Sequence, residues 1–159
     1  MRSVEEWFSE YGESHQNQTN KSIHWICVPL IFFSIIGLLS VIPAGGLKSS
    51  FPEGWQPYMH AGTLLILFGL LFYLRLSVVL ALGMVLVSAV ILYVLKMMHL
   101  AGLPVGWISL GIFVGAWIGQ FIGHKIEGKK PSFLKDLQFL MIGPIWLMGF
   151  LFRSWGIRY

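Results

Sequence analysis

Charged residues and cysteine are both scarce in this chain. Only 11% of its 159 residues are Asp, Glu, Lys or Arg, against roughly a quarter in soluble domains, which excludes an ordinary soluble domain. The single cysteine, Cys27, lies in an apolar run; it excludes an intramolecular disulfide and indicates no redox compartment. Dense basic patches interleaved with aromatic residues are also missing, which argues against binding to nucleic acid.

A signal peptide and internal repeats are missing as well. Residues 1–22 are polar and acidic, with neither an apolar core nor a small-residue cleavage site, so we expect no cleaved signal. No internal repeat or low-complexity tract is evident. A chain of 159 residues has room for one compact helical bundle and no second domain. We therefore expect residues 1–159 to form a single domain.

Apolar residues are abundant, at 56% of the chain, and they are grouped in long runs. Uncharged stretches near 20 residues suit helices that cross a hydrocarbon core of about 30 Å. Four such spans are predicted, at residues 23–42, 58–74, 76–95 and 105–122. A fifth apolar segment, residues 137–152, is interrupted by Gly143 and Pro144. It is either a kinked span or a re-entrant helix.

A short amphipathic helix is predicted at residues 4–11, where apolar side chains recur at helical spacing: Val4, Trp7, Phe8 and Tyr11. Such a helix lies on the membrane surface or on the bundle. His15 continues the apolar face, and Thr19 or Asn20 is expected to cap the next helix. The expected fold is an all-α integral membrane protein: a bundle of four transmembrane helices, the fifth kinked or re-entrant segment, and this N-terminal amphipathic helix.

The distribution of basic residues predicts the orientation. With a cytoplasmic N-terminus, Lys48 and Lys96 lie outside, and the inside carries Arg2, Lys21, Arg75, Lys125, Lys129, Lys130 and Lys135. This is the positive-inside bias of membrane proteins. The lack of a signal peptide or retention tail favours a bacterial inner membrane, with the endoplasmic reticulum membrane as the alternative.

The same orientation sorts the five histidines. His15, His24 and His124 fall on the cytoplasmic side, and His60 and His99 on the other. Neutral imidazole is a common ligand of zinc and iron, and a bound metal would account for polar side chains near lipid. The spacing matches no standard histidine motif, so interfacial histidines bonded to headgroups or backbone stay an alternative. His60 and His99 are interpreted as packed or interfacial, with His99 the better further ligand candidate.

Glycine recurs every fourth residue along the fourth span, at Gly111, Gly115, Gly119 and Gly123. Such a ridge predicts the close approach of another helix, which would hold His124 against the first span. Gln120 lies one turn before His124. It either orients that histidine or a bound oxygen species, or makes a hydrogen bond between helices.

Charged residues flank His124. Glu127 is a metal ligand, a hydrogen-bond partner of a ligating histidine, or an ion-pair partner of Lys129 or Lys130; we favour the last two. Lys125, Lys129 and Lys130 either attract an acidic headgroup or a fatty-acid carboxylate, or anchor the chain at the membrane surface.

Two segments resemble the membrane-embedded 2-hydroxy fatty acid dioxygenase family, typified by a yeast endoplasmic reticulum enzyme of fatty-acid alpha-oxidation. The first is Y-x3-H-x4-N-x3-H-x4-P, formed by Tyr11, His15, Asn20, His24 and Pro29. The second is QFIGHKIEGKKPSFLKDLQFLMIGP, which runs from Gln120 to Pro144. Both occur in the family's order, and the resemblance covers nearly the whole chain.

The resemblance implies an Fe(II)-dependent enzyme that uses dioxygen without 2-oxoglutarate. It would convert a 2-hydroxy fatty acid to the fatty acid one carbon shorter, in contact with membrane lipid. His15, His24 and His124 fall on the family's motif histidines and are the implied metal ligands. The remaining implied site residues are Tyr11, Gln120 and Glu127, in catalytic roles left open, and Asn20, Lys125 and Lys129, in substrate binding.

Two other classes of function stay open. One is a non-enzymatic small membrane protein that binds lipid or assists assembly, with structural histidines. The other is a zinc-dependent membrane hydrolase, because three histidines and a water molecule also suit zinc.

Overall fold

The chain is helical throughout the part that the structure describes. A computed structural model describes residues 2–128 and 139–159, and within them there is no strand. The α-helices are α1 (Val4–Gly12), α2 (Gln18–Ser40), α3 (Ala61–Leu76), α4 (Val78–Leu100), α5 (Val105–Glu127) and α7 (Ile142–Ser154), and two short 3-10 helices are η1 (Gly45–Ser50) and η2 (Gln56–Tyr58). The all-α prediction is confirmed for these residues.

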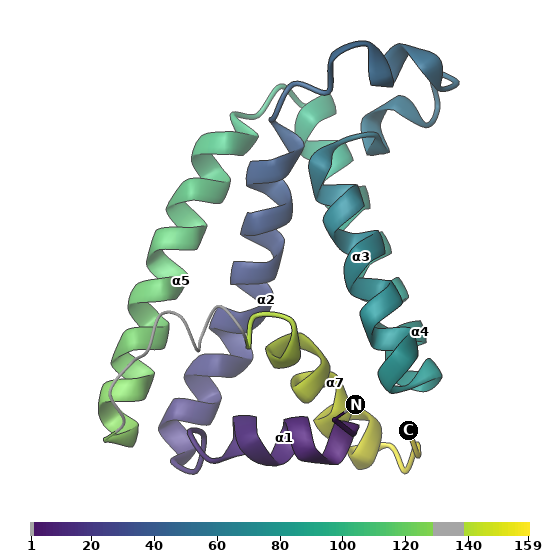
Figure 1. Cartoon of the computed structure of the whole chain (residues 1–159). Helices are drawn as coiled ribbons and strands as arrows, with labels where there is room; N and C mark the ends of the chain where they lie inside the picture. Colours follow the sequence, from purple (N-terminus) through teal and green to yellow (C-terminus); the bar gives the residue numbers. More distant parts are fainter. Residues whose placement is uncertain (1, 129–138) are drawn as a thin grey trace.

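Helices α2, α3, α4 and α5 run between the two ends of the molecule (Figure 1). Helix α1 lies across one end, called here the α1 end, and η1 and η2 lie at the other, the η1 end. The most extensive packing is between α2 and α5, while α3 packs against both α2 and α4. Helix α7 packs against α1, α2 and α4.

Within residues 2–128 and 139–159, three helices are long and apolar enough to cross a membrane: α2, α4 and α5, each of 23 residues. At a rise of 1.5 Å per residue each is about 34 Å long, more than the hydrocarbon core. Helix α3 is apolar but has only 16 residues. Helix α7 has 13 residues and lies in the half of the molecule next to the α1 end (Figure 1). From Ile142 onward the fifth apolar segment therefore does not cross the bundle.

Large apolar side chains cover the outside of the long helices. On α3 and α4 they include Leu64, Phe68, Leu82, Leu86 and Val90, each more than half exposed. Soluble monomers rarely expose continuous apolar surface of this kind, whereas a lipid environment requires it. The interior is also apolar, with fully buried side chains that include Ile36, Leu80, Met84, Leu95 and Ile145. The fold fits a membrane protein.

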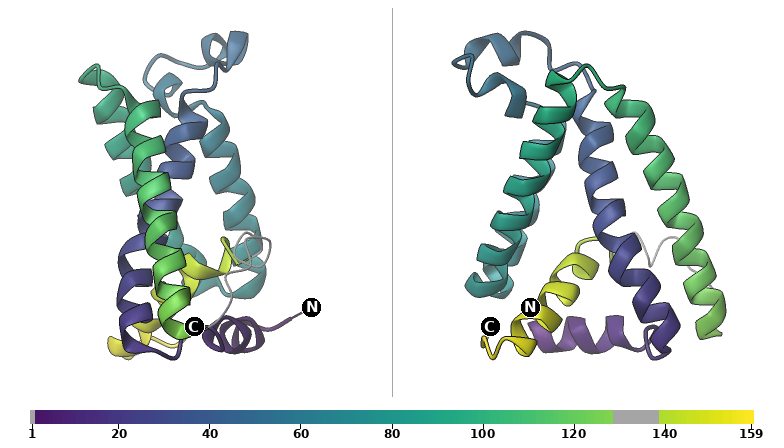
Figure 2. Two further views of the ribbon diagram at one scale, coloured as in Figure 1. Left: turned by 90° about the vertical axis from the view of Figure 1, so that its left-hand side faces the viewer. Right: turned by 180° about the vertical axis from the view of Figure 1, so that it is seen from behind.

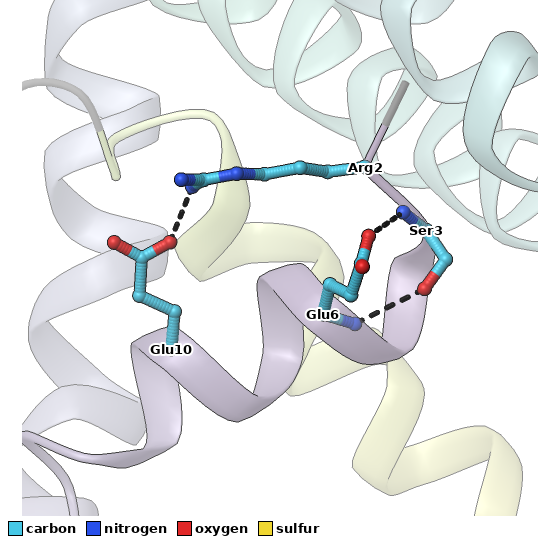
Figure 3. Close-up of polar contacts among 4 residues, drawn as sticks. All are labelled: Arg2, Ser3, Glu6 and Glu10. Atoms are coloured by element: carbon cyan, nitrogen blue, oxygen red, sulfur yellow. Dashed lines mark hydrogen bonds and ion pairs between the residues drawn. The ribbon is translucent and has the colours of Figure 1, made fainter.

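The predicted amphipathic helix is α1, and it lies on the bundle. Its apolar residues Val4, Phe8 and Tyr11 are buried, because α1 packs against α7. Ser3 and Glu6 form a capping box at its start: the Ser3 N–H donates to Glu6 Oε2 (2.7 Å) and the Glu6 N–H to Ser3 Oγ (3.2 Å) (Figure 3). This exchange satisfies two backbone donors that the first helical turn leaves free.

Arg2 fixes the outer face of α1. Its guanidinium pairs with Glu10 (Figure 3) and lies 4.9 Å from the centre of the Trp7 ring. Both contacts are solvent-accessible, so they contribute little to stability. Through them the Arg2 side chain extends along α1 as far as Glu10.

The predicted cap of the second helix is wrong. Asn17 is the N-cap of α2, and its Oδ1 accepts from the N–H groups of Thr19 (2.9 Å) and Asn20 (3.4 Å). The helix therefore begins at Gln18, before both predicted caps and five residues before the predicted span. Polarity alone does not end a helix; the side chain that satisfies the first free N–H groups decides where it begins.

Only half of the predicted glycine ridge faces α2. A Cβ on Gly119 would lie 2.6 Å from Cys27 Sγ, and one on Gly123 would overlap Asn20 Oδ1, whereas Gly111 and Gly115 have nothing within 4 Å. Four residues advance an α-helix by about 400°, so each step along the ridge turns it by about 40°. After twelve residues the ridge has turned by about 120°. Gly111 and Gly115 therefore face away from α2.

Candidate metal centre

Three buried histidines converge at the α1 end of the bundle. His15 lies in the loop between α1 and α2, His24 in the second turn of α2, and His124 in the last turn of α5. One ring nitrogen from each can be chosen so that all three lie within 4.8 Å of one another. The ring centres are 4.2 Å apart for His15 and His24, 5.1 Å for His24 and His124, and 5.5 Å for His15 and His124. The convergence predicted from topology is therefore present.

Backbone carbonyl groups orient two of the three rings. His15 Nδ1 lies 2.6 Å from the carbonyl oxygen of Tyr11, and His24 Nδ1 lies 2.9 Å from that of Asn20. Because a carbonyl oxygen only accepts, each Nδ1 carries the proton and each Nε2 keeps its lone pair. Histidines that bind metals are usually held in this way.

His15 is electrically neutral at ordinary pH. Burial lowers its pKa to about 4, an effect that the hydrogen bond to Tyr11 opposes and that nearby His124 reinforces. Its Nε2 is buried and has no hydrogen-bond partner among the described residues. A neutral imidazole with a free, buried lone pair is the form that binds a metal ion. The donor set therefore fits a metal with three nitrogen ligands.

Asn20 connects the chain segments that carry the three histidines. Its side chain is fully buried, and Nδ2 donates to the carbonyl of Ser14 and to Glu127 Oε2, both at 3.0 Å. Its own carbonyl accepts from His24. Its Oδ1 occupies the space above Gly123 that a Cβ would need. Asn20 thus contacts His24 itself, the residue before His15 and the residue before His124.

Glu127 joins the end of α5 to the start of α2. Its Oε1 accepts from the Gln16 N–H (2.7 Å), and its Oε2 accepts from the Asn17 N–H (2.9 Å) and from Asn20. The carboxylate is not part of the histidine cluster found among the described residues. These contacts make Glu127 a residue that supports the chain around the histidines. Of the roles considered from the sequence, this is closest to a hydrogen-bond partner of a ligating histidine. Lys129 and Lys130, the predicted ion-pair partners, lie outside the described residues.

The other predicted site residues are Gln120, Tyr11, Lys125 and Lys129, and the structure describes the first three. Gln120 is buried one turn before His124, and its Oε1 has no hydrogen-bond partner among the described residues. The Tyr11 ring stacks on His15, with centres 4.2 Å apart. Lys125 is exposed, and Lys129 falls outside the residues that the structure describes.

The two remaining histidines lie at the η1 end, where each contacts a neighbouring polar group. His60 Nδ1 accepts from the Thr63 N–H (3.3 Å) at the start of α3, and His99 Nε2 lies 3.1 Å from Ser40 Oγ. His60 is buried and His99 is exposed, so His60 is a packed histidine and His99 is not. The possibility that His99 completes the metal site is wrong, because the length of the bundle separates it from the three clustered histidines (Figure 1).

Sequence analysis missed Trp146. Its ring centre lies 5.4 Å from that of His15 and 5.0 Å from that of Tyr11, so it covers one side of the cluster. Helix α7 brings it there by packing against α1 and α2. It lies in an apolar segment, and nothing in the surrounding sequence distinguishes it from the chain's other tryptophans as a site residue.

Long apolar helices and a buried three-histidine cluster define a helical membrane-type protein whose site can hold a metal ion. A family model described as "2-hydroxy-palmitic acid dioxygenase Mpo1-like" matches residues 1–155. The chain therefore belongs to the Mpo1-like family, and the resemblance seen in the sequence is confirmed. No curated protein and no solved structure gives a match.

Proposed function

We propose that this protein is an Fe(II)-dependent dioxygenase that converts a 2-hydroxy fatty acid to the fatty acid one carbon shorter. The observation that carries the proposal is the cluster of three buried histidines, two of which, His15 and His24, keep the Nε2 lone pair free because Nδ1 contacts a backbone carbonyl. Family membership supports the substrate class and the use of dioxygen. The proposed ligands are His15, His24 and His124.

Three protein ligands leave positions on the metal for a substrate, and bound Fe(II) would supply the activation of dioxygen there. The protein's own residues supply position and polarity. The carbonyl groups of Tyr11 and Asn20 keep the His15 and His24 rings in one tautomer. Burial keeps the His15 ring neutral. The free Oε1 of Gln120 suits acceptance of a hydrogen bond from the substrate's 2-hydroxyl group.

The remaining site residues have proposed roles of two kinds. Tyr11 and Glu127 are positioning residues, because their contacts are with His15 and with the chain around it. We assign Asn20 to the same role in place of substrate binding, because both of its amide hydrogens are already donated within the protein. Lys125 and Lys129 are the proposed cationic rim for the substrate carboxylate.

The proposed orientation places the α1 end in the cytoplasm, with α3 as the fourth span and the segment containing α7 as a re-entrant helix. Lys21, Arg75 and Lys125 lie on elements that begin or end at the α1 end, whereas Lys48 and Lys96 lie near the η1 end. This separation agrees with the positive-inside rule. A bacterial inner membrane is the proposed location, and the endoplasmic reticulum membrane is the alternative.

Metal analysis combined with turnover tests the function. The protein is purified without a histidine tag, and its iron and zinc contents are measured before 2-hydroxypalmitate and dioxygen are added. Iron with loss of one carbon from the substrate is the expected result. Zinc with hydrolase activity, or no metal at all, would contradict the proposal.

Single substitutions identify the ligands. His15→Ala, His24→Ala and His124→Ala are each expected to abolish metal retention and turnover. His60→Ala is the matched control, because His60 is a buried histidine at the opposite end of the bundle and its loss is expected to leave the metal content unchanged. Equal loss of metal in His60→Ala would show that unfolding, not ligation, explains the result.

A further inference from the structure

An apolar groove of about 520 Å³ opens between α2, α4 and α7. Its walls include Trp25 and Phe33 from α2, Met84 and Val90 from α4, and Leu147 from α7, and every side chain that lines it is apolar. Figure 2 (right) shows the three helices from the side on which α4 is in front.

The groove begins next to the metal centre. On α2 it starts at Trp25, the residue after His24, and extends to Phe33, about 12 Å along the helix axis. A line of aromatic rings connects it to the cluster: Trp146 lies 5.4 Å from His15, Phe150 4.7 Å from Trp146, and Trp25 6.4 Å from Phe150. Consecutive aromatic contacts therefore link the near end of the groove to His15.

We propose that this groove binds the acyl chain of the 2-hydroxy fatty acid whose carboxylate and hydroxyl groups lie at the histidine cluster. The inference rests on the proposed function for the nature of the head group. A molecule with one polar end and one apolar chain matches a buried polar cluster continued by a wholly apolar groove. The groove and the cluster share α2, and Trp146 of α7, the helix that forms another wall of the groove, contacts His15.

The groove selects by shape. Lipid tails are as apolar as its walls, so transfer of a chain from the bilayer into the groove provides little hydrophobic driving force. What the walls can do is limit the length of the chain. Val90 and Phe33 lie at the end farther from the histidines, and this far end sets the longest chain that fits while the head group reaches the metal centre.

Blocking the far end tests this role. Val90→Trp is expected to reduce turnover of 2-hydroxypalmitate relative to 2-hydroxylaurate by about tenfold or more, which is the size of effect that a few methylene groups produce in an apolar site. Val94→Trp is the matched control, because Val94 lies one turn further along α4, is also partly exposed and does not line the groove. Both variants are assayed as the iron-loaded full chain in lipid nanodiscs.

The chain-length preference of each variant is interpreted together with its iron content. If Val90→Trp and Val94→Trp retain iron and show the same chain-length preference as the unsubstituted protein, the groove is not the acyl site. If the unsubstituted protein binds no iron and turns over no substrate, the proposed function fails instead, and the next measurement decides the groove separately.

Photolabelling tests occupancy without turnover. A 2-hydroxypalmitate with a diazirine at the chain terminus is expected to label α4 near Val90, and excess unlabelled 2-hydroxypalmitate is expected to remove the label. A phosphatidylcholine with the same diazirine chain is the comparison. Equal labelling of the groove by the phospholipid, or labelling of exposed α3 residues such as Phe68 to the same extent, would overturn the inference and identify the groove as a general lipid contact.

Discussion

The substitution Asn20→Asp removes the donors at the point where the three histidine-bearing segments meet. Asn20 has no exposed surface, and its Nδ2 donates to the Ser14 carbonyl and to Glu127 Oε2. Aspartate has nearly the same shape but, when ionised, it has no donor. The change would therefore place one carboxylate oxygen 3.0 Å from another and leave the Ser14 carbonyl without its partner.

The expected destabilisation is large for an isosteric change. Coulomb's law gives about 5 kcal/mol for two like charges at that distance and an effective dielectric constant of about 20. Solvent near the partly exposed Glu127 reduces this value, and protonation of the new carboxyl group limits it further. The lost hydrogen bond to Ser14 adds about 1–3 kcal/mol. We expect a net loss of about 3–5 kcal/mol, a large part of the stability of a typical domain.

Two measurements detect this loss: the apparent Tm in detergent and the affinity for iron. The affinity is expected to fall about 10- to 100-fold, as it does when other residues that support metal ligands are substituted. Adding Glu127→Gln to Asn20→Asp is expected to recover part of the Tm, because the glutamine amide can donate to the new carboxylate. Asn17→Asp is the control, since Asn17 is exposed and aspartate caps helices as well as asparagine does.

The reasoning is refuted if Asn20→Asp is as stable as Asn17→Asp and binds iron equally well. It is also refuted if the double variant is no more stable than Asn20→Asp alone. In that case the hydrogen bond between Asn20 and Glu127 would not couple α2 to α5.

Two further predictions concern the helix contact and pH. Gly123→Ala is expected to lower the Tm because its Cβ would overlap Asn20 Oδ1, whereas Gly115→Ala, with open space around it, should be neutral or stabilising by up to about 1 kcal/mol. Burial, reinforced by Lys48 and His99, lowers the pKa of His60 to about 4; the unfolded state therefore binds the additional proton between about pH 6.5 and 4. Stability should fall as pH decreases through that range, and His60→Asn should flatten the fall in Tm.

Much of the architecture follows from the sequence alone. The lengths of the apolar runs predicted α2, α4 and α5, and the spacing of Val4, Phe8 and Tyr11 predicted α1, because a bilayer and an apolar core impose simple periodic requirements on side chains. The distribution of basic residues then assigned three histidines to one side. These features depend on each segment separately and on the order of segments along the chain.

The details of the metal centre depend on the tertiary structure. Glu127 contacts Gln16, Asn17 and Asn20, which are 107 to 111 residues away in the chain, and no local pattern encodes those contacts. Trp146 reaches His15 only because α7 packs beside α1.

The glycine ridge shows the same division between local pattern and packing. Its spacing correctly predicted a close contact with α2, but only Gly119 and Gly123 make that contact, because the ridge turns around α5 and the packing decides which part of it faces α2. The sequence alone determined that the chain would form long apolar helices and predicted that three histidines would meet at one end. Only the packing of α2, α5 and α7 decided which side chains surround those histidines, because that depends on the rotation of each helix about its own axis.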